Sequence, residues 1–283
     1  MMRCISIVHG AVSLVNAIAT RRGATLGIGL EVRATVEAGP GSGVIIEQTG
    51  LSSRLIRSTV LRVVPKRKLL RNKISISVES EIPAGYGLKS SSAISSAVAL
   101  VCSRAFRPGF TDRQVLLAGV EASIESKVSI TGAYDDACSC YFGGFNVTDN
   151  EKRRRVAHSR APPGLGAVIF IPRNRKRGRV KDLGRTPRVF EKAWELARNK
   201  KYWEAMNING FATASVLNSD PTLIARLIGA GALGASVSGN GPAVAAVAKK
   251  ADIPGIKKAF SSLEGRVIVS NVSNRGPKVW SAG

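Results

Sequence analysis

The spacing of apolar and polar residues along the chain changes repeatedly between a period of two and a period near 3.6, so strands and helices alternate irregularly. Ile74–Glu81 alternates apolar and polar residues, which predicts a strand with one buried face. Thr111 stands three residues before Gln114, a capping-box spacing that predicts a helix continuing to about Ser126. Mixed strands and helices without a regular βαβ repeat favour an α+β fold over a doubly wound sheet.

The same pattern predicts the remaining elements. Strands are expected at Arg3–Val8, Ala24–Ala38, Val44–Gln48, Asn146–Thr148, Gly166–Ile171, Ala235–Ser238, Ala243–Ala248 and Arg266–Ser270. Helices are expected at Leu51–Val64, Ser90–Arg104, Pro187–Ala197, Tyr202–Leu217 and Pro221–Gly229. The basic, proline-containing segment Glu151–Pro163 is the best candidate boundary, so we expect an N-terminal domain of residues 1–155 and a C-terminal domain of residues 156–283.

The composition is that of a folded chain with a large core. Hydrophobic residues make up 44% of the 283, and no apolar run is long enough to cross a bilayer. The apolar stretch Cys4–Val8 is too short for a signal peptide, so we expect an opening strand and a cytoplasmic protein. Cys138 and Cys140 have no second cysteine pair or nearby histidine, which favours buried thiols over a metal site.

The chain is strongly basic, with 42 Lys and Arg against 19 Asp and Glu and a formal charge of +23. Such a charge attracts polyanions, and it is concentrated in Lys152–Arg155 and Arg173–Lys181. Nucleic-acid-binding surfaces usually interleave aromatic residues with the charge, whereas Phe170 is the only aromatic residue from Lys152 to Arg185. We therefore interpret these runs as solvated loops and expect no specific nucleic-acid partner.

The segment from Ile82 to Ala93 carries two glycines, Gly85 and Gly87, followed by three serines and a helix-forming run. That order points unpaired backbone N–H groups and the positive end of a helix dipole into the loop, which favours a bound phosphate. The loop is not a Walker A motif, because Leu88 rather than glycine precedes Lys89, and it lacks the third glycine of a dinucleotide fingerprint. A turn followed by an ordinary serine N-cap is the alternative.

Two pairs of acidic residues follow. Glu121 and Glu125 are four apart, so a helix would place both carboxylates on one face. Asp135 and Asp136 lie in a turn introduced by glycine. Phosphoryl transfer from a magnesium nucleotide needs such groups, one carboxylate on the metal and another near the attacking hydroxyl. A solvated helix face and an Asx-turn would explain each pair separately.

A third segment, Gly234–Val244, places small residues around two glycines, so that another backbone or a ligand can approach closely. In this order the three segments resemble the GHMP kinase superfamily, whose signatures are similar to Pro83-x-x-x-Gly87-Leu88-x-Ser90-Ser91-x-Ala93 and Ser238-Gly239-x-Gly241-Pro242-Ala243. Within it, the chain is most similar to archaeal-type shikimate kinases through Gly10–Thr20, Gly23–Ile28 and Thr131–Cys138.

The resemblance implies a GHMP-kinase-like fold of two α+β lobes, the N-terminal one ribosomal-protein-like and the C-terminal one ferredoxin-like, with the active site between them. It implies an enzyme that uses ATP and Mg²⁺ to phosphorylate the 3-hydroxyl of shikimate. The implied nucleotide-binding residues are Pro83, Gly85, Tyr86, Gly87, Leu88, Lys89, Ser90, Ser91 and Ser92. The implied magnesium ligands are Ser91 and Glu125, with Glu121 as the alternative to Glu125.

Asp136 and Asp135 both match the catalytic aspartate, and their spacing does not separate them. Lys89 stands where the phosphate loop commonly has a small residue, and Ser92 where alanine is usual. A lysine beside the phosphates would stabilise transition-state charge, so we add it to the catalytic candidates. Shikimate carries a carboxylate and three hydroxyls, which calls for a cation and polar partners. The expected substrate-binding residues are Asn16, Thr20, Arg21, Asp136, Gly239 and Asn240.

Two alternatives remain open. A homoserine kinase would share the loop signatures, but its substrate carries an ammonium group, and Arg21-Arg22 argue mildly against it. A nucleic-acid-binding protein would account for the positive charge, and it is the weaker alternative because stacking aromatics are missing.

Overall fold

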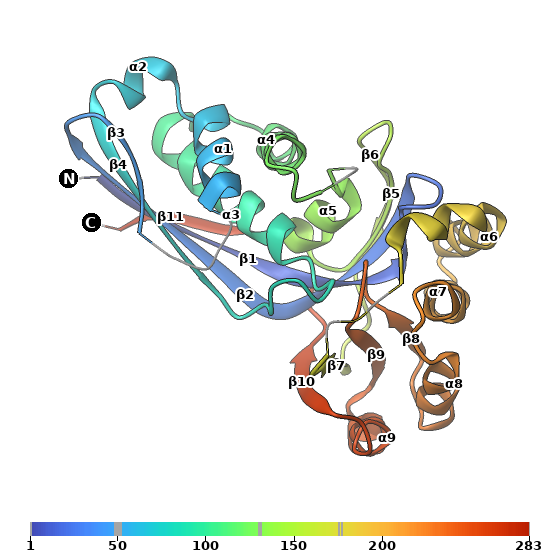
Figure 1. Cartoon of the computed structure of the whole chain (residues 1–283). Helices are drawn as coiled ribbons and strands as arrows, with labels where there is room; N and C mark the ends of the chain where they lie inside the picture. Colours follow the sequence, from blue (N-terminus) through green and yellow to red (C-terminus); the bar gives the residue numbers. More distant parts are fainter. Residues whose placement is uncertain (1, 48–52, 130–131, 175, 177, 283) are drawn as a thin grey trace.

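Two β-sheets organise the molecule (Figure 1). The computed structural model describes residues 2–47, 53–129, 132–174, 176 and 178–282. In the first sheet the strand order is β11-β1-β2-β4-β3, and β5 pairs with β2 and with β6. These strands are β1 (Met2–Val15), β2 (Arg22–Pro40), β3 (Gly43–Ile46), β4 (Asn72–Ser80), β5 (Phe145–Asp149), β6 (Arg154–Ser159) and β11 (Lys278–Ala282).

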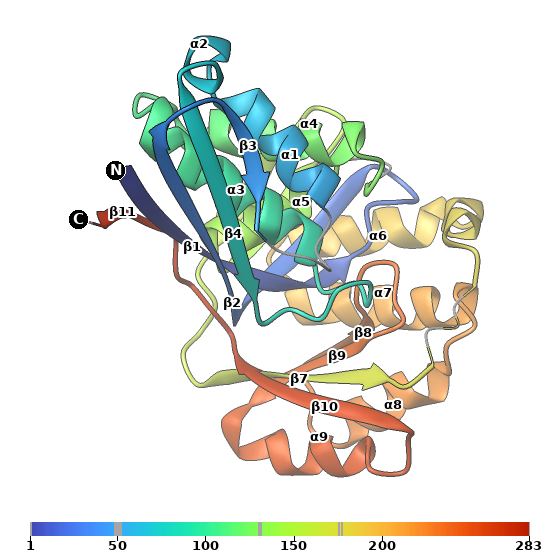
Figure 2. The ribbon, with the colours of Figure 1, turned by 60° about the vertical axis from the view of Figure 1, so that its left-hand side comes forward.

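The second sheet has the strand order β10-β7-β9-β8, with antiparallel neighbours throughout. Its strands are β7 (Leu165–Pro172), β8 (Gly234–Val237), β9 (Val244–Lys249) and β10 (Gly265–Asn271). Figure 2 shows the chain leaving β10 and running back to the first sheet, where β11 lies along β1. The last described strand is therefore part of the first lobe.

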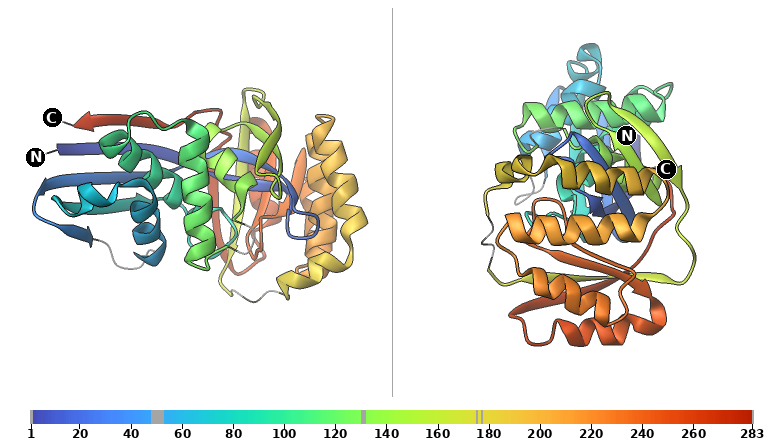
Figure 3. Two further views of the ribbon diagram at one scale, coloured as in Figure 1. Left: turned by 90° about the horizontal axis from the view of Figure 1, so that it is seen from above. Right: turned by 90° about the vertical axis from the view of Figure 1, so that its right-hand side faces the viewer.

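Helices cover one face of each sheet. On the first sheet lie α1 (Ser53–Val63), α3 (Ser90–Phe106), α4 (Asp112–Glu125) and α5 (Tyr134–Phe142), and the short α2 (Lys66–Leu69) leads into β4. The second lobe carries α6 (Pro187–Arg198), α7 (Tyr202–Val216), α8 (Pro221–Gly229) and α9 (Ile253–Ala259). Figure 3 shows α6 and α7 beside the ends of the long strands of the first lobe, so these helices join the two lobes.

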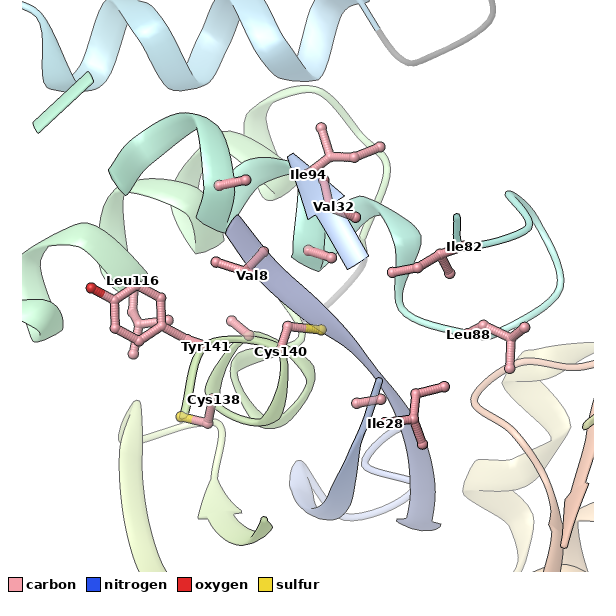
Figure 4. Close-up of a cluster of buried hydrophobic side chains, with 14 of the residues drawn as sticks. Val8, Ile28, Val32, Ile82, Leu88, Ile94, Leu116, Cys138, Cys140 and Tyr141 are labelled. Atoms are coloured by element: carbon pink, nitrogen blue, oxygen red, sulfur yellow. The ribbon is translucent and has the colours of Figure 1, made fainter. Parts of the chain in front are cut away.

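The main hydrophobic core lies between β1, β2 and α3. Small side chains make α3 buried on nearly all sides, so it packs centrally between β1, α1, α4 and α5. Tyr141 and Leu116 are among its largest fully buried side chains, and Figure 4 shows them near Val8 of β1. All four cysteines are free and buried, as expected from the sequence. This core fixes the N-terminal ends of α3 and α5 relative to β1.

Several expected elements are confirmed, and others differ. The capping box at Thr111 and Gln114 is present, and α8 has the expected bounds. Asp135 and Asp136, expected in a turn, lie in the first turn of α5, because Ala133 adopts left-handed dihedrals and starts a new helix behind Gly132. Residue 155, the expected domain boundary, falls inside β6. The ends of the strand and helix expected near residues 48–52 lie outside the described residues.

The basic runs are only partly solvated. Arg153 pairs with Glu121 at 2.9 Å, and the Arg155 guanidinium lies 4.0 Å from the ring centroid of Phe142. These contacts tie the β5–β6 turn to α4 and α5, so the solvated-loop interpretation of Lys152–Arg155 is wrong for two of its members. In the part of the chain that the structure describes, no helix has the length and apolar character needed to cross a membrane.

Candidate active site

A cavity of about 500 Å³ lies where the two lobes meet. The first lobe contributes the end of β1, the loop before α3, the C-terminal end of α4 and the start of α5, and the second lobe contributes the turn after β8. The lining residues are Ser13, Asn16, Ala17, Ile18, Gly85, Gly87, Leu88, Lys89, Ser90, Ser91, Ser92, Ser123, Lys127, Val128, Ser129, Ala133, Asp135, Asp136, Val180, Gly239 and Asn240.

The N-terminus of α3 opens onto this cavity. Lys89 adopts left-handed dihedrals (φ 68°) at the N-cap position, and no side chain caps the helix. The first intrahelical bond runs from the Ala93 amide to the Lys89 carbonyl, so helix geometry leaves the amides of Ser90, Ser91 and Ser92 without intrahelical acceptors. Free amides, serine hydroxyls and the positive end of a helix dipole are groups suited to an anion such as phosphate.

The turn after β8 packs directly against the phosphate loop. Gly87 has a φ of 83°, and a Cβ at this position would lie 1.9 Å from the Ser238 carbonyl oxygen, so only glycine fits. The Ser238 hydroxyl donates to the Gly87 carbonyl at 2.9 Å, and the Ala243 amide donates to the Tyr86 carbonyl at 3.2 Å. The two glycine-containing segments identified in the sequence are therefore in direct contact.

Asp136 faces the phosphate loop from the first turn of α5. Its Oδ1 lies 3.0 Å from Nζ of Lys89, and both side chains are largely buried. Burial and, to a smaller extent, the neighbouring Asp135 raise the pKa of Asp136 to about 7, although Lys89 acts in the opposite direction. A carboxyl group with a pKa near neutrality is suited to accept a proton from a substrate hydroxyl.

Asp135 is held in a different way. It is 4% exposed, its Oδ1 accepts a 2.7 Å hydrogen bond from Asn150 Nδ2, and its amide donates to Asn150 Oδ1 at 3.1 Å. A Cβ on Gly23 would lie 2.3 Å from its Oδ2, so β2 closes around the carboxylate. The structure thus gives the two aspartates different surroundings, which the sequence spacing could not distinguish.

Lys89 is a buried cation that lines the cavity. Its ammonium donates to Ser13 Oγ at 2.8 Å in addition to pairing with Asp136. The residue as a whole is 9% exposed, so these two oxygens compensate the burial of its charge. The sequence placed Lys89 beside the phosphates, and in the structure it joins the loop to both β1 and α5.

The expected substrate-binding residues separate into two groups. Asn16, Gly239 and Asn240 line the cavity, and Asn16 Nδ2 donates to the Gly239 carbonyl at 2.7 Å. Thr20 and Arg21 do not line it: the Thr20 hydroxyl bonds to the backbone of Arg22, and the Arg21 side chain is exposed. In the phosphate loop, Pro83 and Tyr86 are not lining residues either, while the other expected residues are.

The two glutamates of α4 do not reach the cavity in this structure. Glu125 accepts hydrogen bonds from Ser58 at 2.6 Å and from Arg62 at 3.0 Å, and its side chain is 57% exposed. The Ser58 hydroxyl and the Arg62 charge lower its pKa. Glu121 pairs with Arg62 and Arg153. Ser91 therefore lines the cavity, whereas the two candidate carboxylate ligands, Glu121 and Glu125, form ion pairs with Arg62 outside it.

The donor set suits a magnesium ion that arrives with a nucleotide better than a preformed metal cage. Magnesium is usually held by one or two carboxylates together with substrate phosphates. The described residues contain no cluster of three or more His, Cys, Asp or Glu side chains that could hold a metal. Ser91 offers a hydroxyl oxygen at the cavity, and Glu125 lies in the last turn of α4, just before the lining residue Lys127.

Several residues of the site were not identified as site residues from the sequence, among them Ser13, Ser123, Lys127 and Asn150. Ser13 is an internal strand residue and Ser123 an internal helix residue, and nothing in their local pattern separates them from core serines. Asn150 follows β5 in a turn, where asparagine is common for backbone reasons alone. Only the tertiary contacts reveal their positions.

Comparison with known proteins agrees with this geometry. Residues 54–144 match the GHMP kinases N terminal domain. Among solved structures, a homoserine kinase from Cytophaga hutchinsonii superposes with a TM-score of 0.76 at 18% identity, covering 98% of this chain and 97% of that one. The Methanococcus jannaschii mevalonate kinase gives 0.72 at 13% identity, with coverage of 95% and 98%. These likenesses show that the chain has the GHMP kinase fold.

Other proteins are more similar to this chain in sequence than these solved structures are. The shikimate kinase of Methanothrix thermoacetophila is 35% identical over 288 residues, covering 99% of this chain and 98% of that protein. The shikimate kinase of Methanobrevibacter smithii is 32% identical over 278 residues, with coverage of 94% and 96%. Since such identity extends over nearly the whole of both chains, the protein belongs to the family of these archaeal shikimate kinases, within the GHMP kinases.

Proposed function

We propose that this protein is a shikimate kinase that transfers the γ-phosphoryl group of ATP to the 3-hydroxyl of shikimate. The observation that carries the proposal is the Asp136–Lys89 pair, at 3.0 Å, facing the uncapped N-terminus of α3 inside one cavity between the lobes. Phosphoryl transfer asks the protein mainly to position the reactants and to neutralise charge, and this cavity has groups for both tasks.

The nucleotide phosphates would lie on the amides and hydroxyls of Ser90, Ser91 and Ser92. Shikimate would occupy the end of the cavity lined by Asn16, Gly239 and Asn240, so that its 3-hydroxyl lies between Asp136 and the γ-phosphate. Asp136 would accept the hydroxyl proton as the oxygen attacks phosphorus, and Lys89 would stabilise the charge on the transferred group. Burial raises the pKa of Asp136 for this role, and Asp135, held by Asn150, adds to that rise.

Bound magnesium would supply further neutralisation of the phosphate charge. Ser91, which lines the cavity, would be one ligand, and Glu125 would become the second after leaving Ser58 and Arg62. We also infer a cytoplasmic location, because all four cysteines are free thiols and such thiols persist in reducing compartments. The division into domains 1–155 and 156–283 stays a prediction, with β11 as an addition to the first lobe.

The test is an assay of ATP with shikimate, homoserine and mevalonate side by side, with magnesium present and after its removal by a chelator. We expect turnover with shikimate only, and none without magnesium. Turnover of homoserine or mevalonate in place of shikimate would contradict the proposed substrate and leave the phosphotransferase chemistry standing.

A pair of variants tests the assignment of the two aspartates. Asp136→Asn should lower kcat by about 10²-fold or more, as expected for loss of a general base, and should leave the KM for ATP little changed. Asp135→Asn should lower kcat less, because Asp135 acts on Asp136 rather than on the substrate. If both variants kept the wild-type kcat, the catalytic role of this pair would be excluded.

A further inference from the structure

The Lys89 ammonium is held from two sides. A lysine has a flexible four-carbon stem, so its charge has a defined position only where acceptors hold it. One acceptor is Asp136 Oδ1 at 3.0 Å, and the other is Ser13 Oγ at 2.8 Å. Ser13 is 1% exposed and lies in β1, where it pairs with Thr25 of β2, so its backbone is fixed beside the ammonium.

Ser13 Oγ also takes part in the contact between the two lobes. Ser13 Oγ accepts a second hydrogen bond, of 2.9 Å, from the amide of Gly239. The Ser13 amide in turn donates to Ser238 Oγ at 3.3 Å, and that hydroxyl donates to the Gly87 carbonyl. Ser13 therefore contacts the reactive lysine, the turn after β8 and, through Ser238, the phosphate loop.

We propose that Ser13 is a positioning residue for phosphoryl transfer: it holds the Lys89 ammonium against Asp136 and ties this ion pair to the Gly239 turn of the second lobe. The inference rests on the proposed function, because it gives Ser13 its effect through the Lys89–Asp136 pair. Ser13 needs no contact with either substrate for this role. Without its oxygen, the ammonium has one side-chain acceptor fewer, and the Gly239 amide loses its partner.

The chain offers a matched control in the same strand. Ser6 is also fully buried in β1, but its hydroxyl donates to the Ala97 carbonyl of α3, away from the cavity. Ser6→Ala therefore removes a buried hydroxyl without touching Lys89. Ser13→Ala removes the acceptor, Ser13→Cys replaces it with a weakly accepting sulfur at nearly the same volume, and Ser13→Thr retains an oxygen.

We expect Ser13→Ala and Ser13→Cys each to lower kcat about tenfold, the effect of losing one hydrogen bond to a charged group, with KM for ATP changed less than about twofold. Ser13→Thr should retain most of the wild-type kcat, and Ser6→Ala all of it. In a Lys89→Ala background, Ser13→Ala should cause a smaller loss, since the interaction with Lys89 is already absent and only the bond to the Gly239 amide is removed. Equal losses from Ser13→Ala in both backgrounds, or a Ser13→Cys enzyme no slower than Ser6→Ala, would overturn the proposal.

A measurement without turnover separates this proposal from the proposed function. Lys89 and Asp135 are the charged groups that face Asp136, and Lys89 favours its ionised form. An NMR titration of the Asp136 carboxyl carbon in the free protein should show a higher midpoint in Ser13→Ala and Ser13→Cys than in wild type or Ser6→Ala. An unchanged midpoint contradicts the role of Ser13, whereas a shifted midpoint in a protein that does not phosphorylate shikimate contradicts only the substrate assignment.

Discussion

At the scale of single residues, the site depends on two carboxylates that are adjacent in sequence and differently surrounded. Asp135 is held by Asn150 and enclosed by Gly23, while Asp136 pairs with Lys89 across the cavity. Sequence motifs identified both acids and the lysine, since clustered acids are conspicuous in so basic a chain. Ser13 and Asn150 could not be found in this way, because a buried serine in a strand and an asparagine in a turn are common.

The pH dependence of the rate follows from Asp136. Its pKa is raised to about 7, so it is increasingly protonated as the pH falls through that value and cannot accept a proton. We expect kcat/KM for shikimate to fall on the acid side with an apparent pKa of about 7. Asp135→Asn removes the negative charge beside Asp136, so it should move the acid limb of the pH–rate profile to lower pH. A rate independent of pH between about 5 and 8 would contradict the assignment of Asp136 as the base.

Gly23 provides a structural test of the Asp135 position. Alanine at this residue would place Cβ 2.3 Å from Asp135 Oδ2, so the carboxylate must shift and its bond to Asn150 must weaken. We expect Gly23→Ala to lower kcat by about tenfold, comparable to losing one hydrogen bond to a charged group. Gly29→Ala is the control in the same strand, since its Cβ would have no neighbour nearer than 3.4 Å. Similar kcat values for the two variants would show that the position of Asp135 is unimportant.

At the scale of elements, the two helices whose N-termini line the site begin without a capping side chain. α3 and α5 both begin behind a residue in left-handed conformation, Lys89 and Ala133, and both direct their N-termini into the cavity. The sequence predicted α3 from its serine cluster and apolar run. It did not predict α5, because Gly132 and the paired aspartates have the local pattern of a turn, and only packing of Cys138 and its neighbours against β1 and β2 favours the helix.

The ion pairs between α1 and α4 give a prediction for metal binding. Arg62 of α1 contacts both Glu121 and Glu125 of α4, and so competes with any cation for Glu125. If Glu125 is a magnesium ligand, Arg62→Ala should lower the Mg²⁺ concentration needed for half-maximal activity, by about two- to fivefold for an exposed ion pair worth up to about 1 kcal/mol. Arg57→Ala is the control on the same helix, because its side chain contacts a backbone carbonyl of β3 instead.

The magnesium requirement is measured by titrating Mg²⁺ at a fixed ATP concentration, and metal binding without turnover by titrating Mn²⁺ into the protein with a non-hydrolysable nucleotide. An unchanged requirement in Arg62→Ala, together with normal activity in Glu125→Gln, would exclude Glu125 as a ligand and leave Ser91 and the phosphates.

At the scale of the whole molecule, the lobes are not consecutive pieces of chain. The sequence pattern predicted two units separated near residue 155, but β6 crosses that position and β11 returns to the first sheet. β11 could not be foreseen from the sequence, because it is short, follows a loop that ends in Gly276-Pro277, and is stabilised by pairing with β1 and packing against α3. β2, β4 and β7 were predicted close to their observed bounds, whereas β1 continues past its expected end at Val8 to Val15.

Removal of residues 278–283 tests the contribution of β11. It deletes the strand that pairs with β1 from Arg3 to Ile7 and exposes that edge of the first sheet. We expect a loss of about 2 kcal/mol in the free energy of unfolding, seen as a fall in Tm of about 5 °C. Trp280→Thr keeps the backbone pairing and should lose less than half as much. An unchanged Tm after truncation would show that β11 contributes little to stability.

The return of β11 has a consequence for how the protein is made. The ribosome synthesises residues 278–282 after the entire second lobe, yet these residues complete the sheet that begins at Met2. During translation the outer edge of β1 therefore stays open until the second lobe has emerged, and closing it joins partners separated by almost the full sequence. Contacts between residues so far apart in the sequence form slowly. The nascent first lobe therefore has an exposed, aggregation-prone strand edge for most of the time that the protein is being synthesised.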